Sequence, residues 1–258
     1  MLIMILISGL IGTASANDLI KKADEFYELR GEGYDKETLF ASTANIDKAI
    51  PLYSEAMTSS TGVVKEEAIA KLLQAYYFKG RYAMPDKDSR KAVYEEAIKI
   101  GEESLKEYPE SAAIHVMMAA ILGVWSQDIG MITAARSGVA NKIREHCEVA
   151  MKSDDIRIKA GGYRILGRVH SVAPKIPFIL GWPSKKKGVE LLEKALEMEP
   201  KSLITKYFLA EALYERDKKE RAIKLMEEIP GTNEMVHGVV EDAVVKRDAT
   251  EDLKKWNK

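Results

Sequence analysis

Small and large apolar residues recur at helical spacing along most of the chain, and stretches rich in Val, Ile and Thr that alternate with period two are absent. A pattern of small, large and small residues at positions 0, +4 and +7 of a helix occurs in five copies, which are separated by four steps along the chain. Because residues seven apart share one face of a helix, the two small residues let a neighbouring helix approach closely. The pattern predicts a stack of helical hairpins, and its copies are Ala49, Tyr53 and Ala56; Ala97, Gly101 and Ser104; Ile143, Cys147 and Ala150; Gly188, Leu192 and Ala195; and Ala222, Met226 and Ile229.

The first helix of each pair carries a signature of its own, which is clearest at Tyr163, Leu166, Gly167 and His170 and at Leu209, Ala210 and Leu213. These residues, together with the step of 34 residues from Gly188 to Ala222, resemble the tetratricopeptide repeat. The resemblance implies an all-α fold, a right-handed solenoid of degenerate tetratricopeptide-like hairpins. We predict four hairpins over residues 17–230 and a capping helix from about Glu234 toward Trp256.

Long inserts within the hairpins distinguish this chain from a plain repeat. Three of the four steps between copies exceed 34 residues, by about 11 to 14. The excess lies between the two helices of a hairpin, over residues 81–88, 125–140 and 171–184. Because stacked hairpins align their turns, we expect all three inserts on one side of the solenoid, where insertions often form a binding face.

The start of the chain has the pattern of a targeting segment. It is uncharged in its side chains, apolar over residues 2–11 and small over residues 14–16. Since the apolar run is shorter than the about 20 residues of a membrane span, we predict a signal peptide over residues 1–16 and a mature domain over residues 17–258. The alternative is a start that is retained as an anchor.

Further segments carry a more specific likeness: residues 124–130, the helix that ends near Cys147 and Ala150, and residues 161–170, 173–182 and 185–195. They resemble the T-component of tripartite ATP-independent periplasmic transporters. That resemblance implies an exported partner of a periplasmic solute-binding protein that shelters a hydrophobic or anionic small molecule. Through Leu166-Gly167-Arg168 and the paired prolines of the insert, the chain is also similar to the tetratricopeptide proteins called regulators of microtubule dynamics.

Composition narrows the class of protein. The 258 residues carry 39 basic and 40 acidic side chains, and this balance argues against a nucleic-acid binder, which would show a basic excess. The single cysteine, Cys147, excludes an intramolecular disulfide, and the four histidines form no HExxH pair. We therefore predict a protein that is not an enzyme and has no cofactor and no metal site.

Basic charge is nevertheless concentrated in one region. Residues 156–188 hold eight Lys and Arg and no Asp or Glu, which would steer an anionic ligand or an acidic partner unless the run of Lys185 to Lys187 is a solvated turn. Arg164 and Arg168 lie four apart at groove-lining positions of the repeat, and like charges there repel by a few tenths of a kcal/mol. The compensating charge is either a ligand or partner carboxylate, or internally Glu211, at the equivalent position of the next repeat.

Aromatic side chains in the inserts are the other binding candidates. Trp125 and Trp182 each fall in a long insert, and Phe178 lies in a stretch whose prolines prevent a helix. The insert either folds back over its own hairpin, or walls a cavity or contacts another protein. The predicted ligand or partner residues are Arg164, Arg168, Tyr207, Glu211, Trp125, Trp182 and Phe178.

Two settings fit these features. The first is a non-enzymatic exported binding or scaffold protein, soluble in the periplasm after cleavage, that serves a solute-binding protein or transporter. The alternative is a tetratricopeptide scaffold that binds peptide segments of a cytoplasmic or membrane-associated protein complex.

Export distinguishes the exported binding protein from the cytoplasmic or membrane-associated scaffold, and it can be tested directly. If the first sixteen residues are a cleaved signal peptide, mass spectrometry of the protein from its host will find Asn17 at the amino terminus. An intact Met1 on protein in the soluble cytoplasmic fraction would contradict the prediction.

Overall fold

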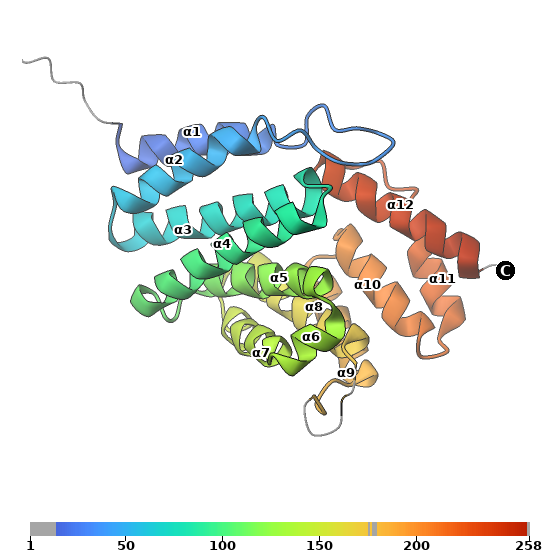
Figure 1. Ribbon diagram of the computed structural model, residues 1–258. Coiled ribbons are helices and arrows are strands. Elements are labelled where there is room, and N and C mark those ends of the chain that lie inside the picture. Colours follow the sequence, from blue (N-terminus) through green and yellow to red (C-terminus); the bar gives the residue numbers. More distant parts are fainter. Residues whose placement is uncertain (1–13, 175, 177–179, 257–258) are drawn as a thin grey trace, which may run out of the picture.

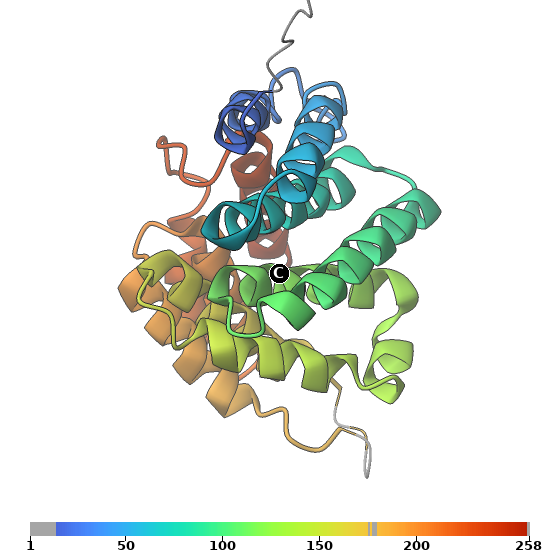
Figure 2. The same ribbon diagram turned by 90° about the vertical axis from the view of Figure 1, so that its left-hand side faces the viewer.

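The computed structural model describes residues 14–174, 176 and 180–256, and its helices pack side by side in chain order (Figures 1 and 2). Residues 1–13 of the predicted signal peptide lie outside the described residues. The first helix, α1, begins at Ala16, and its amino end is capped by Ser15, whose hydroxyl accepts a hydrogen bond from the backbone N–H of Asp18 at 3.2 Å. The predicted cleavage after Ala16 would thus remove this cap.

The described chain forms an all-α solenoid of five hairpins, one more than predicted, because four steps separate five copies of the second helix. The first helices are α1 (Ala16–Glu28), α3 (Gly62–Phe78), α5 (Ala112–Ile129), α8 (Ile156–Val172) and α10 (Leu203–Tyr214). Their partners are α2 (Ile46–Thr58), α4 (Lys87–Glu107), α7 (Val139–Ala150), α9 (Lys185–Met198) and α11 (Lys219–Glu227). A short helix, α6 (Met131–Arg136), lies within the third hairpin, and α12 (Val239–Trp256) follows the fifth.

Small residues set the distance between helices, as the sequence pattern predicts. A Cβ added to Gly167 of α8 would lie 2.8 Å from Leu192 Cγ and 3.1 Å from the backbone oxygen of Gly188 on α9. A Cβ on Gly188 would in turn lie 3.0 Å from the backbone oxygen of Gly167. Because real Cβ atoms do not approach so closely, any larger residue here would push α8 and α9 apart.

The connections within the hairpins do gather along one edge of the solenoid. The backbone N–H of Ala41, in the first connection, donates to the oxygen of Tyr82, in the second, at 2.7 Å. Ala135 of α6 and Leu180 of the fourth connection are buried in one apolar cluster. The first connection, residues 29–45, was not predicted, because no earlier copy precedes it from which a step could be measured.

Two predicted inserts are shorter than expected. Trp125 lies inside α5 rather than in an insert, because nothing interrupts that helix before Gly130, which has a φ of +93°. The insert over residues 81–88 begins within a π-helical turn, Lys79–Ala83, that continues directly from α3. The insert over residues 171–184 begins at the last turn of α8, and its described residues after that turn, 173, 174, 176 and 180–184, lie outside any helix.

The last helix closes the stack onto the first hairpin (Figure 1). Arg30 follows α1, and its Nε donates to Glu241 Oε1 of α12 at 2.9 Å while another N–H donates to the backbone oxygen of His237 at 3.0 Å. The guanidinium lies over the ring of Tyr27, 4.3 Å from its centroid. Val240 of α12 is fully buried in the core cluster of the first hairpins. We call the Arg30–Glu241 pair and its neighbours the clasp.

The clasp explains why α12 begins at Val239 and not near Glu234 as predicted. The Asp242 carboxylate accepts hydrogen bonds from the backbone N–H groups of Val236, at 2.6 Å, and His237, at 3.3 Å. A side chain that holds these donors acts as a cap, so the preceding segment is kept out of the helix.

Among the described helices, α5 alone has a length and an apolarity that would suit a membrane span. In the solenoid it is the central helix, and it packs against α3, α4, α7 and α8.

The clasp is expected to contribute strongly to stability. Arg30→Met leaves the Glu241 carboxylate buried without its counter-charge, and breaking a buried pair in this way costs about 3–5 kcal/mol. The free energy of unfolding, measured with urea and circular dichroism, should fall by that amount. Lys106→Met is the control, because Lys106 and Glu103 form an exposed pair, of a kind worth about 0.2–1 kcal/mol. Equal losses in the two variants would contradict a stabilising clasp.

Candidate functional site

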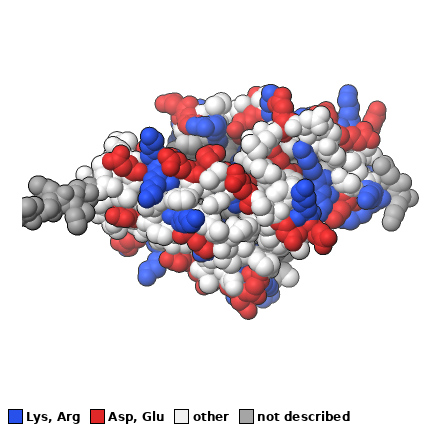
Figure 3. All heavy atoms as spheres, turned by 90° about the horizontal axis from the view of Figure 1, so that it is seen from above, with Lys and Arg blue, Asp and Glu red and all other residues white. Residues whose placement is uncertain are grey.

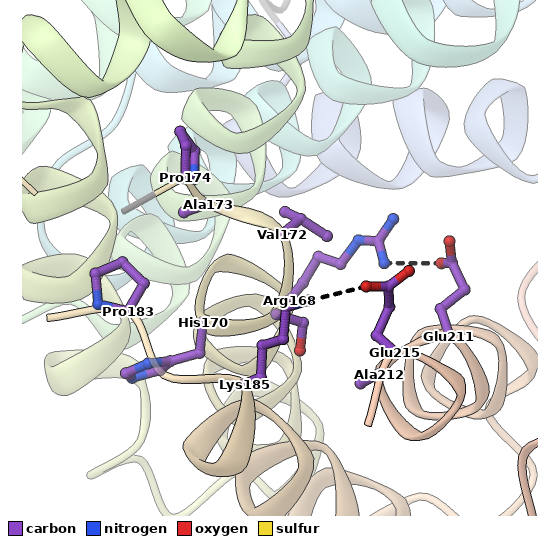
Figure 4. Close-up of a pocket in the computed structure, with 11 residues that line it drawn as sticks. Arg168, His170, Val172, Ala173, Pro174, Pro183, Lys185, Glu211, Ala212 and Glu215 are labelled. Atoms are coloured by element: carbon purple, nitrogen blue, oxygen red, sulfur yellow. Dashed lines mark hydrogen bonds and ion pairs between the residues drawn. The ribbon is translucent and has the colours of Figure 1, made fainter. Parts of the chain in front are cut away.

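A hollow of about 700 Å³ opens between the carboxyl end of α8, the connection to α9, and α10 (Figure 4). We call it the α8–α10 hollow. It lies on the side of the solenoid that is lined by first helices, since α8 and α10 are the first helices of consecutive hairpins. Its described lining is Arg168, His170, Ser171, Val172, Ala173, Pro174, Pro183, Lys185, Glu211, Ala212 and Glu215.

Two ion pairs cross the α8–α10 hollow. Arg168 donates to Glu211 Oε2 at 2.7 Å, and its guanidinium lies 4.4 Å from the centroid of the Phe208 ring. Lys185 donates to Glu215 Oε2 at 2.8 Å. Burial raises the pKa of Glu211 above its ordinary value, and the charge of Arg168 opposes that rise. The hollow therefore offers two matched pairs of opposite charge rather than one excess charge.

The other wall of the hollow is apolar and held in place. Val172, Ala173, Pro174 and Pro183 come from the end of α8 and the following connection, so proline rings restrict the backbone there. At the end of this connection, His170 Nδ1 accepts the backbone N–H of Ser184 at 3.0 Å. The wall thus combines apolar surface with little conformational freedom, which favours ligand binding because less ordering entropy is lost.

Trp182 anchors the same connection. Its Nε1 donates to Asn141 Oδ1 of α7 at 2.8 Å, its ring meets that of His170 edge to face at 4.9 Å, and Arg144 lies 4.8 Å from its centroid. Leu180 is buried beside it. The described part of the insert therefore packs both on α8 of its own hairpin and on α6 and α7 of the preceding one, and its prolines also wall the hollow, so it combines features of both alternatives above.

The other predicted residues with described side chains do not line the hollow. Arg164 pairs with Glu199 at 3.2 Å, Tyr207 donates to Asp252 of α12 at 2.8 Å, and Trp125 donates to Glu95 at 3.4 Å. Of the predicted set, only Arg168 and Glu211 line the hollow, and they compensate each other internally. Phe178 lies outside the described residues.

The basic run over residues 156–188 does not make a basic surface patch. Arg157 pairs with Asp155, Arg164 with Glu199, Arg168 with Glu211, Lys185 with Glu215, and Lys187 with Glu190. Figure 3 shows a different face, over α1, α2 and α12, and there too acidic and basic side chains are interspersed. The carboxylates come mostly from neighbouring helices, so a count along the sequence overstates the positive field.

Sequence reasoning missed Lys185 and Glu215 as members of the site. The available signal was the spacing of Glu211 and Glu215, which lie four apart on α10 and so share one helix face. That acidic face matches the basic face of α8 and the start of α9.

No catalytic arrangement is visible in the part of the chain that the structure describes. His115 and His146 lie with their Nδ1 atoms 2.8 Å apart, and His115 Nε2 contacts the backbone oxygen of Pro109 at 2.9 Å. Burial lowers the pKa of His146 to about 4, helped by the neighbouring His115. Burial also raises the pKa of the Cys147 thiol, which makes it a poor nucleophile. The described residues contain no group of three or more His, Cys, Asp or Glu suited to a metal ion.

Comparison with known proteins gives two family matches. The family described as Regulator of microtubule dynamics protein 1-3 matches residues 19–169, which is more than half of the chain. A tetratricopeptide repeat family matches residues 186–235. Both resemblances drawn from the sequence, to the repeat and to the regulators, are confirmed, while the resemblance to the transporter T-component stays a prediction.

One solved structure agrees with this fold. The crystal structure of a thermophilic TPR protein from Thermus thermophilus has a TM-score of 0.60, with 13% sequence identity, and the likeness covers 94% of this chain and 98% of that one. At that identity the likeness shows the fold alone. No curated protein matches the chain.

The packing of Trp182 can be tested by stability. Trp182→Ala removes a partly buried ring worth about 1.5–3 kcal/mol, and each kcal/mol shifts the melting temperature of a protein of this size by about 2–4 °C. We expect a loss of several degrees in a thermal melt, and no loss for Ile132→Ala, whose side chain is 59% exposed. An unchanged melting temperature for Trp182→Ala would show that the ring is not part of the fold.

Proposed function

The chain belongs to the family of Regulator of microtubule dynamics protein 1-3, and from this premise we propose that it is a non-enzymatic binding protein whose α8–α10 hollow holds a peptide segment of another protein. The observation that carries the proposal is the hollow itself, which is formed by the first helices of two consecutive hairpins and one apolar connection. Concave faces of this kind are the extended binding surfaces of solenoid proteins.

The chemistry of the lining suggests what the segment looks like. One side presents Arg168, Glu211, Lys185 and Glu215 as two ion pairs, and the other presents Val172 and neighbouring prolines. Such a site suits an extended peptide whose apolar side chain faces the proline wall while its backbone N–H and C=O groups meet the charged side. Because the charges are matched, we expect binding to depend on apolar contact and hydrogen bonds more than on net charge.

The buried histidine and cysteine are separate from the proposed binding site. The buried His146 and Cys147 have shifted pKa values for which burial is the main cause, and neither residue lines the hollow. The family name describes its members as regulators of microtubule dynamics, so tubulin is the first protein to test as a source of the segment.

A second candidate setting is the exported accessory protein, favoured by the uncharged apolar start over residues 2–11. In that setting the segment would come from a periplasmic solute-binding protein, and the amino-terminal mass measurement described above decides between the two. The site proposed here is the same in both.

The test uses two exposed valines on helices. Val172, at the end of α8, lines the hollow and is 44% exposed, whereas Val63, at the start of α3, lies elsewhere and is 79% exposed. Val172→Arg places a charged chain in the hollow without disturbing the core, and Val63→Arg is the matched control. Peptides selected on the full wild-type chain from a random display library should bind Val172→Arg at least tenfold more weakly, about 1.4 kcal/mol, and Val63→Arg as well as wild type.

Circular dichroism spectra and melting temperatures of both variants should match those of the wild type. Peptides that bind both variants equally, or a selection that enriches no peptide, would contradict the proposed site.

A further inference from the structure

We propose that a second, smaller hollow on the connection edge is a receptor for a carboxylate carried on a short apolar stem, with Arg81 as its counter-charge. This site is separate from the α8–α10 hollow, and the inference does not rest on the function proposed above. The second hollow measures about 240 Å³ and is lined by Phe40, Arg81, Arg90, Tyr94, Val124, Gln127 and Asp128.

One arginine of this hollow is already satisfied. Arg90 donates to both carboxylate oxygens of Asp128, at 3.1 and 2.7 Å, and to the backbone oxygen of Pro85 at 2.7 Å. This bidentate pair neutralises Asp128, the carboxylate among the lining residues. Arg90 and Asp128 therefore form a fixed wall rather than an available charge.

Arg81 is not satisfied in this way. Its side chain is exposed, it lies 5.9 Å from the centroid of the Tyr82 ring, and no carboxylate within the described residues pairs with it. The side chain keeps exposed surface although neighbouring atoms partly desolvate its guanidinium. That desolvation acts to lower the pKa of Arg81, and the nearby Tyr82, Tyr77, Tyr94 and Asp248 outweigh it, so that the pKa is raised.

Asp248 of α12 is the carboxylate whose charge acts on Arg81, so it is the internal candidate for a partner. Its carboxylate is engaged by Arg247, at 2.8 Å, and forms no ion pair with Arg81. With Arg90 and Asp128 cancelling each other, the lining of the hollow keeps a formal charge of +1, located on Arg81.

The backbone around Arg81 is built to hold it there. Arg81 is the central residue of the π-helical turn Lys79–Ala83, and single π turns occur often at functional sites. Gly80 packs so tightly on the Tyr94 ring that any side chain would collide with it. The hydrogen bond from Ala41 N–H to Tyr82 O, at 2.7 Å, ties the turn to the first connection. Both neighbours of Arg81 are therefore fixed.

The lining selects the ligand class. A guanidinium presents a planar fork that matches a carboxylate through two hydrogen bonds. Phe40 and Val124 supply apolar surface for a stem, and the exposed amide of Gln127 supplies a further donor. The volume corresponds to about eight water molecules at about 30 Å³ each, which fits a glutamate side chain or the carboxyl end of a peptide.

The experiment follows the backbone amide resonances of the residues that line the hollow, and in the wild type also the Arg81 Nε–H resonance, by nitrogen-15 NMR on the full chain during titration with butyrate, a carboxylate on a short stem. The backbone amides report binding in every variant, including those that lack the guanidinium. We expect a saturable shift with butyrate and none with butyramide, which has the same shape without the charge. Arg81→Gln should weaken butyrate binding at least tenfold, and Arg81→Lys should weaken it less, because the charge remains while the fork is lost. Arg136→Gln is the control, because Arg136 is also exposed and forms no ion pair with any described residue.

Three results would overturn the proposal: equal shifts with butyramide, equal loss in Arg136→Gln, or a wild-type resonance that butyrate does not move. A fourth result that would overturn the proposal is evidence that Arg81 pairs with a carboxylate of the chain itself. If Asp248→Asn shifts the Arg81 resonance and a double-mutant cycle couples the two residues, Arg81 belongs to an ion pair that simply exchanges with the Arg247 pair. Should Arg81→Gln fail to fold, the wild-type titration and Arg81→Lys decide.

Discussion

The stack depends on how closely its helices approach at small residues. Gly167 and Gly188 bring the backbones of α8 and α9 so near that neither position has room for a Cβ. In a solenoid each hairpin buries its apolar face mainly against its neighbours. The distance between two adjacent hairpins therefore also determines where the hairpins that follow them lie. The position of α10 relative to α8, and hence the width of the α8–α10 hollow, follows from these contacts.

The clasp adds a contact that a simple stack lacks. Arg30 and Glu241 are 211 residues apart, and their pair joins the first hairpin to the last helix. Because α12 is held at both ends, by Glu241 near its start and by the stacked rings of Tyr214 and Trp256 at its end, the open side of the solenoid is bounded.

The sequence predicted the parts of the molecule that repeat and missed those that do not. The small, large, small pattern places all five second helices correctly, and Glu211 as the partner of Arg168 was one of two predicted alternatives. Trp125 was misplaced, because an insert measured only as excess length does not show where a helix ends. The clasp and both hollows depend on contacts between distant segments, which no local spacing encodes.

The charged residues show the same difference between their distribution along the sequence and their pairing in the folded chain. The basic run over residues 156–188 is conspicuous in the sequence, yet most of its described side chains pair with carboxylates, three of them from other helices, and these pairs reduce its net field. Arg81 has no such prominence in the sequence, and its charge is left without a carboxylate partner among the described residues because the fold engages Asp128 with Arg90 and Asp248 with Arg247. A charge left unmatched in a hollow attracts ligands more specifically than a larger charge that is already paired, because only the first gains a new bond on binding. In this solenoid both hollows form where the ends of helices meet the connections between them, and the side chains that line the hollows come from both.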